Sequence, residues 1–345
     1  MPAYAALDVS MKATSIHIVD DTGARLWRGK VATDPGPIAE ALRRHAPDLA
    51  RVGLETGCWS TWLYHGLVDR GLPVACMDAR QTKAALSLKI NKTDANDAEG
   101  LAQLLRTGFF REVRVKGWDA MQVRTLIGTR RRLVRTELDL ANQLRGALRT
   151  FGLMLGKGGG RRFEAAVREH LADRPDLAAI VTPLLDAWRA IRAQVARLDR
   201  LVRAVARRDP RCRLLMTAPG VGCVTAITYI AAVESPGEFR DGHAVSAWIG
   251  LTPTRYQSGE VDVAGRISRR GDRLLRTYLY EAASQVLTRS RMDSALKRWG
   301  QSLRARVGHK RAVVAVARKL AVVLHAMWAK NRPFDPGATA AEVAA

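Results

Sequence analysis

One stretch near the N-terminus decides the fold: residues 4–31, with the sequence YAALDVSMKATSIHIVDDTGARLWRGKV. It contains three short segments rich in β-branched and apolar residues, at 4–9, 14–19 and 25–31. Turn-forming residues separate these segments, and Asp20-Asp21-Thr22-Gly23 is the clearest such group. Short β-rich segments joined by tight turns predict an antiparallel meander of three strands.

Helices and strands alternate after this meander. The apolar residues that follow Pro35-Gly36-Pro37 have helical spacing. The pattern then predicts, in order, a strand at 51–55, a helix at 61–69, a strand at 73–77 and a helix at 94–106. Three meandering strands followed by alternating helices and strands form the order of an α/β ribonuclease-H-like fold. We assign this fold to a domain at residues 1–115.

The next segment, 116–208, has an entirely helical pattern. One apolar seam advances in steps of four and three residues, as the a and d positions of a coiled coil do. Its members are Leu184, Trp188, Ile191, Val195, Leu198, Val202 and Val205. A less regular seam upstream consists of Ile127, Val134, Leu138, Ala141 and Leu148. Gly158-Gly159-Gly160 breaks the helix between them. The pattern fits an intramolecular helical hairpin as well as an oligomerising coiled coil, and we favour the coiled coil.

The composition changes again near the start of the last third, where we place a mainly α C-terminal domain at 209–332. The turn Pro219-Gly220-Val221-Gly222 precedes an apolar helix at 225–233. Gly220 and Gly222 leave backbone N–H groups free at a helix N-terminus, where a phosphate can bind. Any tight turn into a helix has this pattern, but it also resembles the turn of a helix-hairpin-helix nucleic-acid-binding element.

The charge of the chain is strongly lopsided. Its 345 residues include 56 Lys and Arg against 33 Asp and Glu, a formal net charge of +23. Such an excess indicates a polyanionic partner, most commonly nucleic acid. Apolar residues make up 47% of the chain, which excludes wholesale disorder. The arginines expected to contact phosphates are Arg130, Arg131 and Arg132 in the helical segment, and Arg266, Arg269, Arg270, Arg273 and Arg276 in the last third.

Several other classes of protein do not fit the sequence. The N-terminus lacks the basic and apolar regions of a signal peptide. The most apolar stretch, 312–328, is interrupted by Arg318 and Lys319, so we expect no membrane span. The cysteines have neither C-x-x-C spacing nor histidines at zinc-site spacing, which predicts reduced thiols in a cytoplasmic protein. The Ala-rich residues 333–345 lack periodicity, and we expect a disordered tail.

Four carboxylates occupy positions where chemistry is expected. Asp8 lies within the first predicted strand, in an apolar segment where burial of an unpaired carboxylate is costly. Glu55 ends a later strand, and Asp94 and Asp97 are three residues apart, on one face of a helix. The first and fourth strands of a ribonuclease-H-like sheet are neighbours, and the last helix packs beside them. We therefore expect the four side chains to converge at one edge of the sheet.

A convergent set of carboxylates predicts a metal site. Mg²⁺ prefers a few carboxylates together with water and substrate phosphate, and Mn²⁺ is able to replace it. Two such ions roughly 4 Å apart stabilise the attacking and leaving oxygens of phosphodiester cleavage. Each member alone has a plainer explanation: Asp94 as a helix N-cap, Asp97 as a first-turn carboxylate, and Glu55 as a loop residue at a strand end.

Ser258 lies in the sequence Arg255-Tyr256-Gln257-Ser258-Gly259, ahead of the arginines of the last third. A serine before a glycine is usually a turn residue. The alternative is a nucleophile whose hydroxyl attacks phosphorus to form a phosphoserine link, with nearby arginines stabilising the pentacovalent charge. The elbow Gly-x-Ser-x-Gly is absent and no histidine lies within ten residues, so a hydrolase triad has no local support. These residues alone leave both interpretations open.

Taken together, the motifs resemble the insertion-sequence-110 family, the bacterial DEDD-type transposases. The similar N-terminal motifs are Leu7-Asp8-Val9-Ser10, Leu54-Glu55-Thr56-Gly57 and Lys92-Thr93-Asp94-Ala95-Asn96-Asp97-Ala98. The similar C-terminal motifs are Pro219-Gly220-Val221-Gly222, Ala247-Trp248-Ile249-Gly250-Leu251-Thr252-Pro253, and Gln257-Ser258-Gly259 with Arg276 downstream. The resemblance spans nearly the whole chain, with the motifs in the expected order and no departure at a key position.

The resemblance implies more than the residues show. It implies a RuvC-like N-terminal domain, similar to Holliday-junction resolvases, whose metal ligands are Asp8, Glu55, Asp94 and Asp97. It implies that Ser258 is a covalent nucleophile brought to a metal site in a homo-oligomer, a dimer or tetramer. Donor and target DNA would be recognised by base pairing with a guide RNA encoded by the element, while the protein holds the backbones. The excess of positive charge suits binding of both nucleic acids.

Three functions therefore fit the sequence. The leading one is a DNA recombinase that excises and inserts a bacterial insertion sequence by Mg²⁺-dependent cleavage and a serine–DNA intermediate. The second is a metal-dependent junction-resolving nuclease in which Ser258 only shapes a turn. The third is a catalytically inactive nucleic-acid-binding protein that remains from a decayed element.

Overall fold

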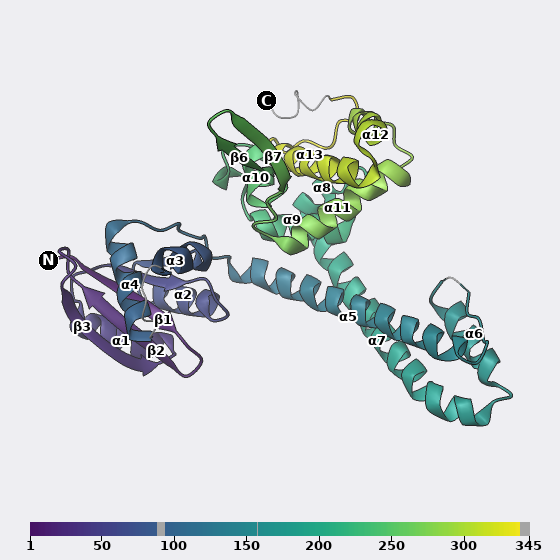
Figure 1. Ribbon diagram of the computed structural model, residues 1–345, viewed down its shortest axis with the longest axis horizontal. Helices are drawn as coiled ribbons and strands as arrows, with labels where there is room; N and C mark the ends of the chain where they lie inside the picture. Colours follow the sequence, from purple (N-terminus) through teal and green to yellow (C-terminus); the bar gives the residue numbers. More distant parts are fainter. Residues whose placement is uncertain (88–93, 157, 339–345) are drawn as a thin grey trace. The chain divides into compact units, whose positions relative to one another are not determined.

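The structure is a computed structural model that describes residues 1–87, 94–156 and 158–338, with the backbone alone for residues 94–96. The chain divides into two compact units, Met1–Gly117 and Trp118–Ala345 (Figure 1). Each unit has its own hydrophobic core and its own sheet.

The N-terminal unit is built on a five-stranded mixed sheet. Its strands are β1 (Ala3–Val9), β2 (Ala13–Val19), β3 (Arg25–Ala32), β4 (Leu49–Glu55) and β5 (Val74–Met77). They lie in the order β3-β2-β1-β4-β5; β2 is antiparallel to β1 and β3, whereas β4 is parallel to β1 and β5. This order with these directions is that of a ribonuclease-H-like sheet, so the predicted meander and the predicted α/β ribonuclease-H-like fold of the N-terminal domain are confirmed.

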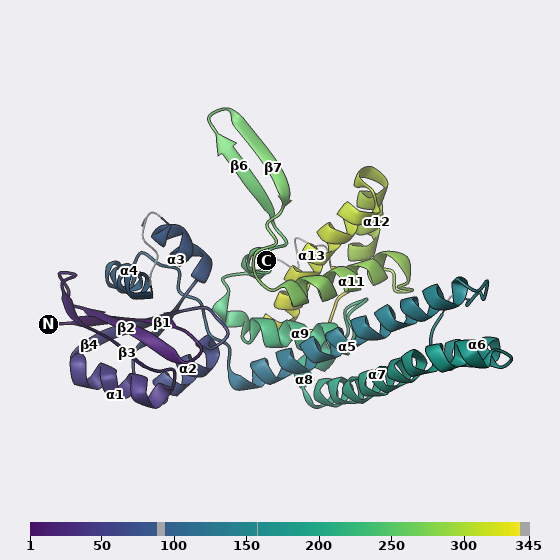
Figure 2. The ribbon, with the colours of Figure 1, turned by 60° about the horizontal axis from the view of Figure 1, so that its bottom comes forward.

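Helices cover both faces of this sheet (Figure 2). They are α1 (Pro35–His45), α2 (Ser60–Val68), α3 (Ala79–Leu86) and α4 (Asp94–Thr107). One face packs against α1 and α2, where Leu42 and Leu67 are fully buried. The opposite face packs against Leu101 and Leu105 of α4. Side chains alternate between the two faces of a strand. Ala6 of β1 packs with α4, so Asp8, two residues further on, lies on the same face of the sheet.

The sequence did not predict α3. This helix follows β5 directly, and the Asp78 carboxylate caps its N-terminus by accepting hydrogen bonds from the backbone N–H groups of Arg80 (2.9 Å) and Gln81 (3.4 Å). The helix has eight residues and buries only Thr82. A helix this short with one buried position has no apolar periodicity to detect, and the capping aspartate was the available signal.

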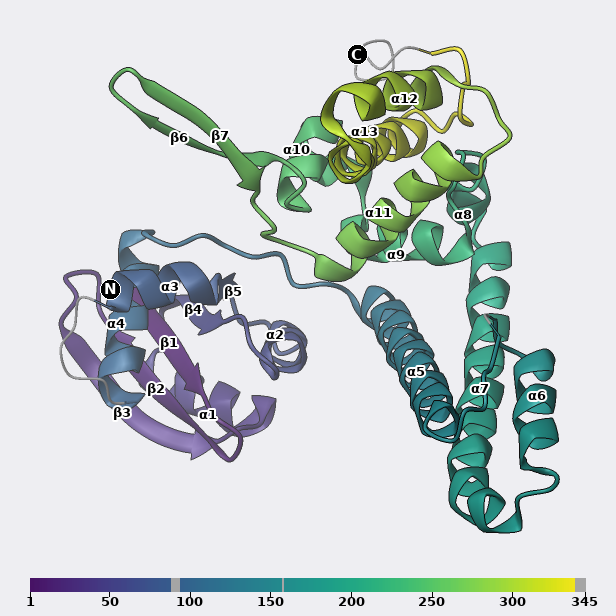
Figure 3. The ribbon, with the colours of Figure 1, turned by 45° about the vertical axis from the view of Figure 1, so that its right-hand side comes forward.

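The C-terminal unit contains a long helical arm. It is formed by α5 (Trp118–Arg149), α6 (Arg161–Leu171) and α7 (Pro175–Arg208), and α5 and α7 lie side by side (Figure 3). Ion pairs Arg130–Asp199 and Glu137–Arg192 join the two long helices and show that they run antiparallel. Trp188, one member of the predicted α7 seam, is 1% exposed and packs in a core shared with α5 and α6.

The α5 seam differs from its prediction. Val134 and Leu138 were expected to be buried, but they are exposed by 37% and 50%. Ala141, Leu144 and Leu148 carry the packing further along the helix instead. The two long helices therefore pair within one chain, and association of this arm with a second chain stays a prediction.

The main core of the C-terminal unit is made by helices from its second half. They are α8 (Pro210–Leu215), α9 (Cys223–Val233), α10 (Gly242–Trp248), α11 (Arg273–Thr288), α12 (Ala295–Val307) and α13 (His309–Ala329), with a short 3-10 helix at Pro236–Glu238. Ile127 of α5 and Val202 of α7 belong to the same core, which joins the expected segments 116–208 and 209–332 in one unit.

One helix of this unit, α13, is long and apolar enough to cross a membrane by length and composition. However, 67% of its most apolar 18-residue segment is buried inside the unit, where Val313, Val316 and Leu320 are fully buried. Such burial is typical of the core helix of a folded domain. We therefore interpret α13 as the central helix of the C-terminal core.

A β-hairpin interrupts the helices of the C-terminal unit. Its strands β6 (Pro253–Ser258) and β7 (Val261–Ile267) are antiparallel, and they project from the helical body (Figures 2 and 3). Every residue of β6 is exposed. The expectation of a mainly α domain holds for its body but missed this hairpin.

The prediction of a disordered tail is wrong for its first residues. The backbone N–H of Phe334 donates to Thr217 Oγ1 (2.9 Å), and the backbone N–H of Ala295 donates to the Pro336 carbonyl (2.9 Å). The Phe334 ring packs against the main core. Residues 333–338 are therefore attached to the C-terminal unit, and the rest of the expected tail lies outside the described residues.

Candidate active site

Asp8 and Glu55 lie at matching ends of neighbouring strands. β1 and β4 are parallel, and Leu7 pairs with Leu54 in their register, so the next residue of each strand is a carboxylate. Both side chains are partly exposed. They line one cavity of about 110 Å³, whose other wall residues are Leu7, Val9, Thr56, Gly57, Cys58, Trp59 and Ser60. Two carboxylates from distant parts of the sequence thus share one small cavity.

Both carboxylates point to the face of the sheet that α4 covers. Ala6, two residues before Asp8, packs in the core beneath α4. Gly53, two residues before Glu55, faces the same helix, because a Cβ added there would lie 3.1 Å from the side chain of Leu105. This helix contacts β1, β2 and β4, and its first turn contains the remaining predicted carboxylates.

The structure brings the predicted tetrad together only in part. Asp97 lies in the first turn of α4 and is partly exposed. Among the described side chains, no three His, Cys, Asp or Glu are close enough to hold a metal ion. The side chain of Asp94 lies outside the described residues. Asp8 and Glu55 are therefore the pair that the described structure places in one site.

Thr82 is a site residue that the sequence analysis missed. Its hydroxyl donates a hydrogen bond to Glu55 Oε1 and a longer one, 3.3 Å, to the Asp78 carbonyl. Thr82 is 1% exposed, and it comes from α3, the helix that the sequence did not predict. The end of β4 is held in place as well, because the backbone N–H of Ala79 donates a hydrogen bond to Thr56 Oγ1 (3.1 Å). Glu55 is thus held from one side by a buried donor.

Ser258 lies at the closed end of the β6–β7 hairpin. It pairs with Val261 across the turn, and Gly259 in that turn has a φ of +55°. The face of the hairpin that carries Ser258 also carries Tyr256 and Val263, a directly paired and exposed apolar couple. The serine is therefore a turn residue by position and, at the same time, an accessible hydroxyl on an exposed apolar surface.

The arginines downstream of Ser258 are separated from it within the chain. Residues 261–267 form the return strand, so Arg266 lies at the base of the hairpin, opposite Thr254, whose Oγ1 donates to the Arg266 carbonyl (3.2 Å). At ~3.4 Å per residue, about 17 Å of strand separates the turn from the base. The expectation that these arginines stabilise charge at Ser258 is therefore wrong within one chain, because the length of the hairpin separates its turn from its base.

The base of the hairpin is closely packed and basic. A Cβ at Gly271 would lie 1.9 Å from the Trp248 carbonyl, and one at Gly250 would lie 2.0 Å from the Arg270 carbonyl. The backbone N–H of Arg269, a residue with a φ of +54°, donates to the Gly250 carbonyl (3.1 Å). The exposed arginines at this base are Arg266, Arg269, Arg270 and Arg273. They form one basic surface patch, which we call the hairpin-base patch.

Arg276 is partly buried and makes hydrogen bonds to the loop of this region. Its Nη1 donates to the Ile249 carbonyl (2.6 Å) and to the Arg270 carbonyl (3.1 Å). Partial burial lowers the pKa of Arg276, and the neighbouring charges of Arg269 and Arg273 act in the same direction. Arg276 therefore positions the loop of the hairpin-base patch, and its predicted phosphate contact stays a prediction.

The arginines of the helical arm also divide. Arg130 Nε donates to Asp199 Oδ1 (2.5 Å), which joins α5 to α7. Burial of the Arg130 guanidinium opposes its charge, but the hydrogen bond and charge of Asp199 outweigh this and raise its pKa. Arg131 is partly exposed and lies near Glu281, while Arg132 is exposed. Arg130 is an internal ion-pair partner, and Arg132 remains available for phosphate.

The glycines of the predicted phosphate-binding turn also have different roles. Gly220 has a φ of +76°, and a Cβ there would lie 2.4 Å from the Ala282 carbonyl of α11. Close packing against α11 therefore explains why this residue is glycine. Gly222 is exposed, precedes α9 and has open space around it. Gly222 therefore leaves the N-terminus of α9 open, and phosphate binding at this turn stays a prediction.

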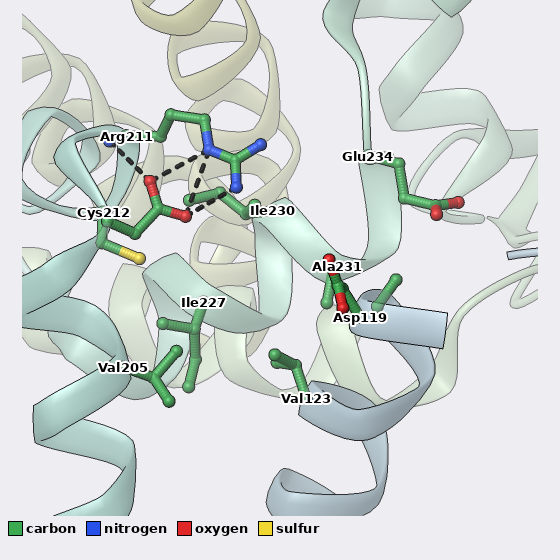
Figure 4. A pocket seen from close by; sticks show the side chains of 11 residues that line it. Asp119, Val123, Val205, Arg211, Cys212, Ile227, Ile230, Ala231 and Glu234 are labelled. Atoms are coloured by element: carbon green, nitrogen blue, oxygen red, sulfur yellow. Dashed lines mark hydrogen bonds and ion pairs between the residues drawn. The ribbon is translucent and has the colours of Figure 1, made fainter. Parts of the chain in front are cut away.

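A larger cavity, of about 210 Å³, lies in the C-terminal unit (Figure 4). It is lined by residues of α5, α7, α8 and α9, and none of them belongs to the predicted site. In its wall, Arg211 and Asp209 form a two-armed ion pair, at 3.0 Å from Nε and 2.7 Å from Nη2. Burial raises the pKa of the neighbouring Cys212 to about 12. The ion pair and the inert thiol give this cavity a structural character.

The two buried cysteines, Cys76 and Cys212, have no catalytic setting. All four cysteines lie within the described residues and are free thiols. Burial raises the pKa of Cys76 to about 11, with the charge of Glu112 acting in the same direction. A thiol with so high a pKa is a poor nucleophile at neutral pH.

The N-terminal sheet and its paired carboxylates are typical of ribonuclease-H-like domains that act on nucleic-acid phosphodiesters. Comparison with protein families gives the particular group. Residues 5–152 match a family model described as "Transposase", a DEDD-type insertion-sequence-110 model, and residues 212–299 match "Transposase IS116/IS110/IS902 family". The chain belongs to this family and is a DNA transposase.

Curated relatives agree with the family models. A probable family 20 transposase of Pseudomonas aeruginosa is 32% identical over 72% of this chain and 76% of the relative. The transposase for insertion sequence element IS1111A of Coxiella burnetii is 31% identical over 80% of this chain and 76% of the relative. A putative transposase of Sinorhizobium fredii is 34% identical over 68% of this chain and 62% of the relative.

A similarity to the solved Thermus thermophilus RuvC structure covers 32% of this chain and 99% of that one, with 16% identity and a TM-score of 0.24. A similarity of this extent carries no argument. The assignment of the fold rests on the strand order and strand directions of the N-terminal sheet.

Proposed function

We propose that the chain cuts and joins DNA at a Mg²⁺ site held by Asp8, Glu55, Asp94 and Asp97, with Mn²⁺ able to replace Mg²⁺. The observation that carries this proposal is the shared cavity of Asp8 and Glu55 at the ends of parallel neighbouring strands. Two carboxylates of this kind supply the hard oxygen ligands that Mg²⁺ prefers. The first turn of α4 carries the other two carboxylates, and this helix covers the same face of the sheet.

The bound ion would supply charge neutralisation at the scissile phosphate and activation of the attacking oxygen. The residues of this chain orient that chemistry. Glu55 is held in place by the buried hydroxyl of Thr82, and Asp8 is fixed by its position in a strand between two neighbours. Preorganisation of this kind lets the ligands keep their geometry when substrate enters.

We further propose that Ser258 is the nucleophile that forms a covalent link to DNA. Its Oγ attacks phosphorus, a serine O–P bond forms, and one P–O bond of the DNA breaks. The leaving sugar oxygen takes up a proton, and the serine hydroxyl loses one, so the number of phosphoester bonds is conserved. What supports this role is the exposure of Ser258 at the end of a projecting hairpin, where a phosphate can reach it.

The serine and the carboxylates belong to different units, and we propose that a homo-oligomer, a dimer or tetramer, assembles them into one site. The exposed apolar face around Ser258 supports such an assembly: Tyr256 is 68% exposed, Val261 52% and Val263 55%. A lone two-stranded hairpin is marginally stable in water. Coverage of this face in an assembled complex would both stabilise the hairpin and fix the serine.

Binding of nucleic acid is assigned to the exposed arginines. The hairpin-base patch, Arg132 and the turn at Gly222 offer phosphate contacts, and the net charge of +23 supports binding of both DNA and an element-encoded guide RNA. Base pairing with that RNA would then choose the donor and target sequences. The protein would act in the bacterial cytoplasm, on the nucleoid.

The metal site is tested by charge-neutral substitutions in the full chain. Asp8→Asn and Glu55→Gln are each expected to abolish Mg²⁺-dependent cleavage of element-end DNA while leaving DNA binding intact. Asp69→Asn, which neutralises an exposed carboxylate at the end of α2, is the matched control and should cleave normally. Full cleavage by Asp8→Asn would overturn the metal site, and the absence of cleavage in the unsubstituted protein would favour an inactive remnant.

The serine role is tested by trapping a protein–DNA adduct on a suicide substrate. Ser258→Ala should form no adduct, whereas Ser302→Ala, at an exposed position of α12, should form it normally. An adduct in Ser258→Ala would refute the nucleophile. Cleavage without any adduct in the unsubstituted protein would identify a metal-only nuclease.

A further inference from the structure

Two exposed tryptophans stand beside the paired carboxylates. Trp59 is 40% exposed and Trp62 is 38% exposed. Their ring centroids are 5.9 Å apart with the planes at 61°, an edge-to-face arrangement. Trp59 also lines the cavity that holds Asp8 and Glu55. An aromatic surface is therefore continuous with the wall of the candidate active site.

The backbone around Trp59 is held firmly relative to Glu55. Only three residues separate the two, and the turn between them is closed by Ser60, whose Oγ donates to the Gly57 carbonyl (2.8 Å) and accepts from the Gly57 N–H (3.2 Å). The backbone N–H of Thr56 donates to the Met77 carbonyl of β5 (2.9 Å). The backbone that carries Trp59 is thus anchored next to the carboxylates.

The packing of the N-terminal unit does not require tryptophans at these two exposed positions. α2 buries Leu63 and Leu67 completely against the sheet, and Trp62 lies on the remaining exposed side of the same helix. Burial of a large aromatic side chain releases more free energy than burial of most other side chains, so an exposed aromatic pair beside a reaction site is typical of a binding surface. The ligand that reaches this place is the strand whose phosphate the carboxylates receive.

We propose that Trp59, backed by the edge of Trp62, stacks on an unpaired nucleobase next to the scissile phosphate. The proposal rests on the proposed function, which puts that phosphate at Asp8 and Glu55. A base inside a duplex is already stacked on both sides, so a protein ring can stack only on a base that is unpaired or flipped out. The substrate class at this site is therefore DNA that is locally unpaired at the cut.

The test compares the affinity of the full-length protein for two labelled 24-base-pair DNA duplexes in Ca²⁺ buffer. One is continuous, and the other carries a single bulged 2-aminopurine. The ratio of the two dissociation constants cancels the backbone contacts that both probes share, and stacking quenches 2-aminopurine fluorescence. The unsubstituted protein should prefer the bulged DNA and quench its fluorescence. Base stacking on an aromatic ring corresponds to a preference of about tenfold.

Trp59→Ala should abolish both the preference and the quenching, and Trp59→Phe should restore most of each because it keeps a ring. Phe109→Ala is the control, since Phe109 is a 67% exposed aromatic residue of the same unit outside the cavity wall. Equal affinity of the unsubstituted protein for both probes, or an unchanged preference in Trp59→Ala, would overturn the proposal. Asp8→Asn should keep the preference and lose cleavage, so failure of the metal site and failure of base stacking are distinguished.

Discussion

Replacement of Thr82 by valine should weaken metal binding without unfolding the protein. Valine has nearly the shape of threonine but lacks the hydroxyl that donates to Glu55 Oε1. Thr82 is 1% exposed, so no water takes its place from the α3 side, whereas Glu55 is partly exposed and keeps access to water from the cavity. Loss of an outer-sphere partner of a ligating carboxylate costs about 10- to 100-fold in metal affinity. Because water reaches Glu55, we expect the lower end, about tenfold.

The assay is a Mg²⁺ titration of cleavage of labelled element-end DNA. The Mg²⁺ concentration for half-maximal rate should rise about tenfold in Thr82→Val, while the rate at saturating Mg²⁺ stays close to that of the unsubstituted protein. Thr82→Ser keeps the hydroxyl and should titrate normally, and so should Thr107→Val at the exposed end of α4. An unchanged half-maximal concentration in Thr82→Val would refute the reasoning, as would a lower maximal rate with an unchanged titration.

Three further predictions concern the C-terminal unit. Gly271→Ala places a Cβ 1.9 Å from the Trp248 carbonyl at a φ of +83°, so the free energy of unfolding should fall by ~2 kcal/mol or more, as measured by thermal denaturation. Burial opposes the charge of Asp209, but hydrogen bonds from Arg211 outweigh it and lower the pKa of Asp209. The Asp209 carboxylate therefore stabilises the fold fully at pH values above the unfolded carboxyl pKa of about 3.9. The difference in free energy of unfolding between the unsubstituted protein and Asp209→Asn should shrink as the pH falls through the lower pKa of folded Asp209. A difference that stays constant from pH 7 to pH 2 would contradict this expectation. Arg269→Gln should lower DNA affinity and reduce the slope of log K against log salt by about 1, and an unchanged slope would remove Arg269 from the interface.

The N-terminal fold was accessible from the sequence because its signals are local. β-rich segments and turns such as Asp20–Gly23 fix the meander, and the pattern also predicted the strand that ends at Glu55. The order of elements then restricts the sheet to one arrangement, which brings Asp8 beside Glu55. This proximity follows from topology and needs no side-chain detail.

Other features depend on contacts that a pattern does not contain. Thr82 was missed because its function comes from a buried hydrogen bond to Glu55, 27 positions away. Val134 and Leu138 fit an apolar seam, yet both side chains are exposed in the folded arm. Arg130 looked like a free cation within an arginine run, and only the packing of the arm shows Asp199 beside it.

The environment of Ser258 shows a further limit of prediction from sequence. In the sequence, Ser258 and Arg266 are eight positions apart and suggest one site. The two-residue turn after Ser258 folds the chain back, so that these residues lie at opposite ends of a hairpin. Proximity along the chain is a poor guide wherever an undetected turn reverses its direction.

The exposed tryptophans were also visible in the sequence without being recognised. Trp59 and Trp62 follow the Glu55 motif directly, but residue type alone does not distinguish a core aromatic from an exposed one. The structure decides this through exposure and through the place of Trp59 in the cavity wall.

Anomalous diffraction from crystals grown with Mn²⁺ tests the metal site most directly. The account predicts a Mn²⁺ peak bound by carboxylate oxygens of both Asp8 and Glu55, with the carboxylates of α4 completing the ligand set, and no peak there in crystals of Asp8→Asn. Mn²⁺ bound elsewhere, or a cavity without Mn²⁺ at saturating concentration, would contradict the account at its centre.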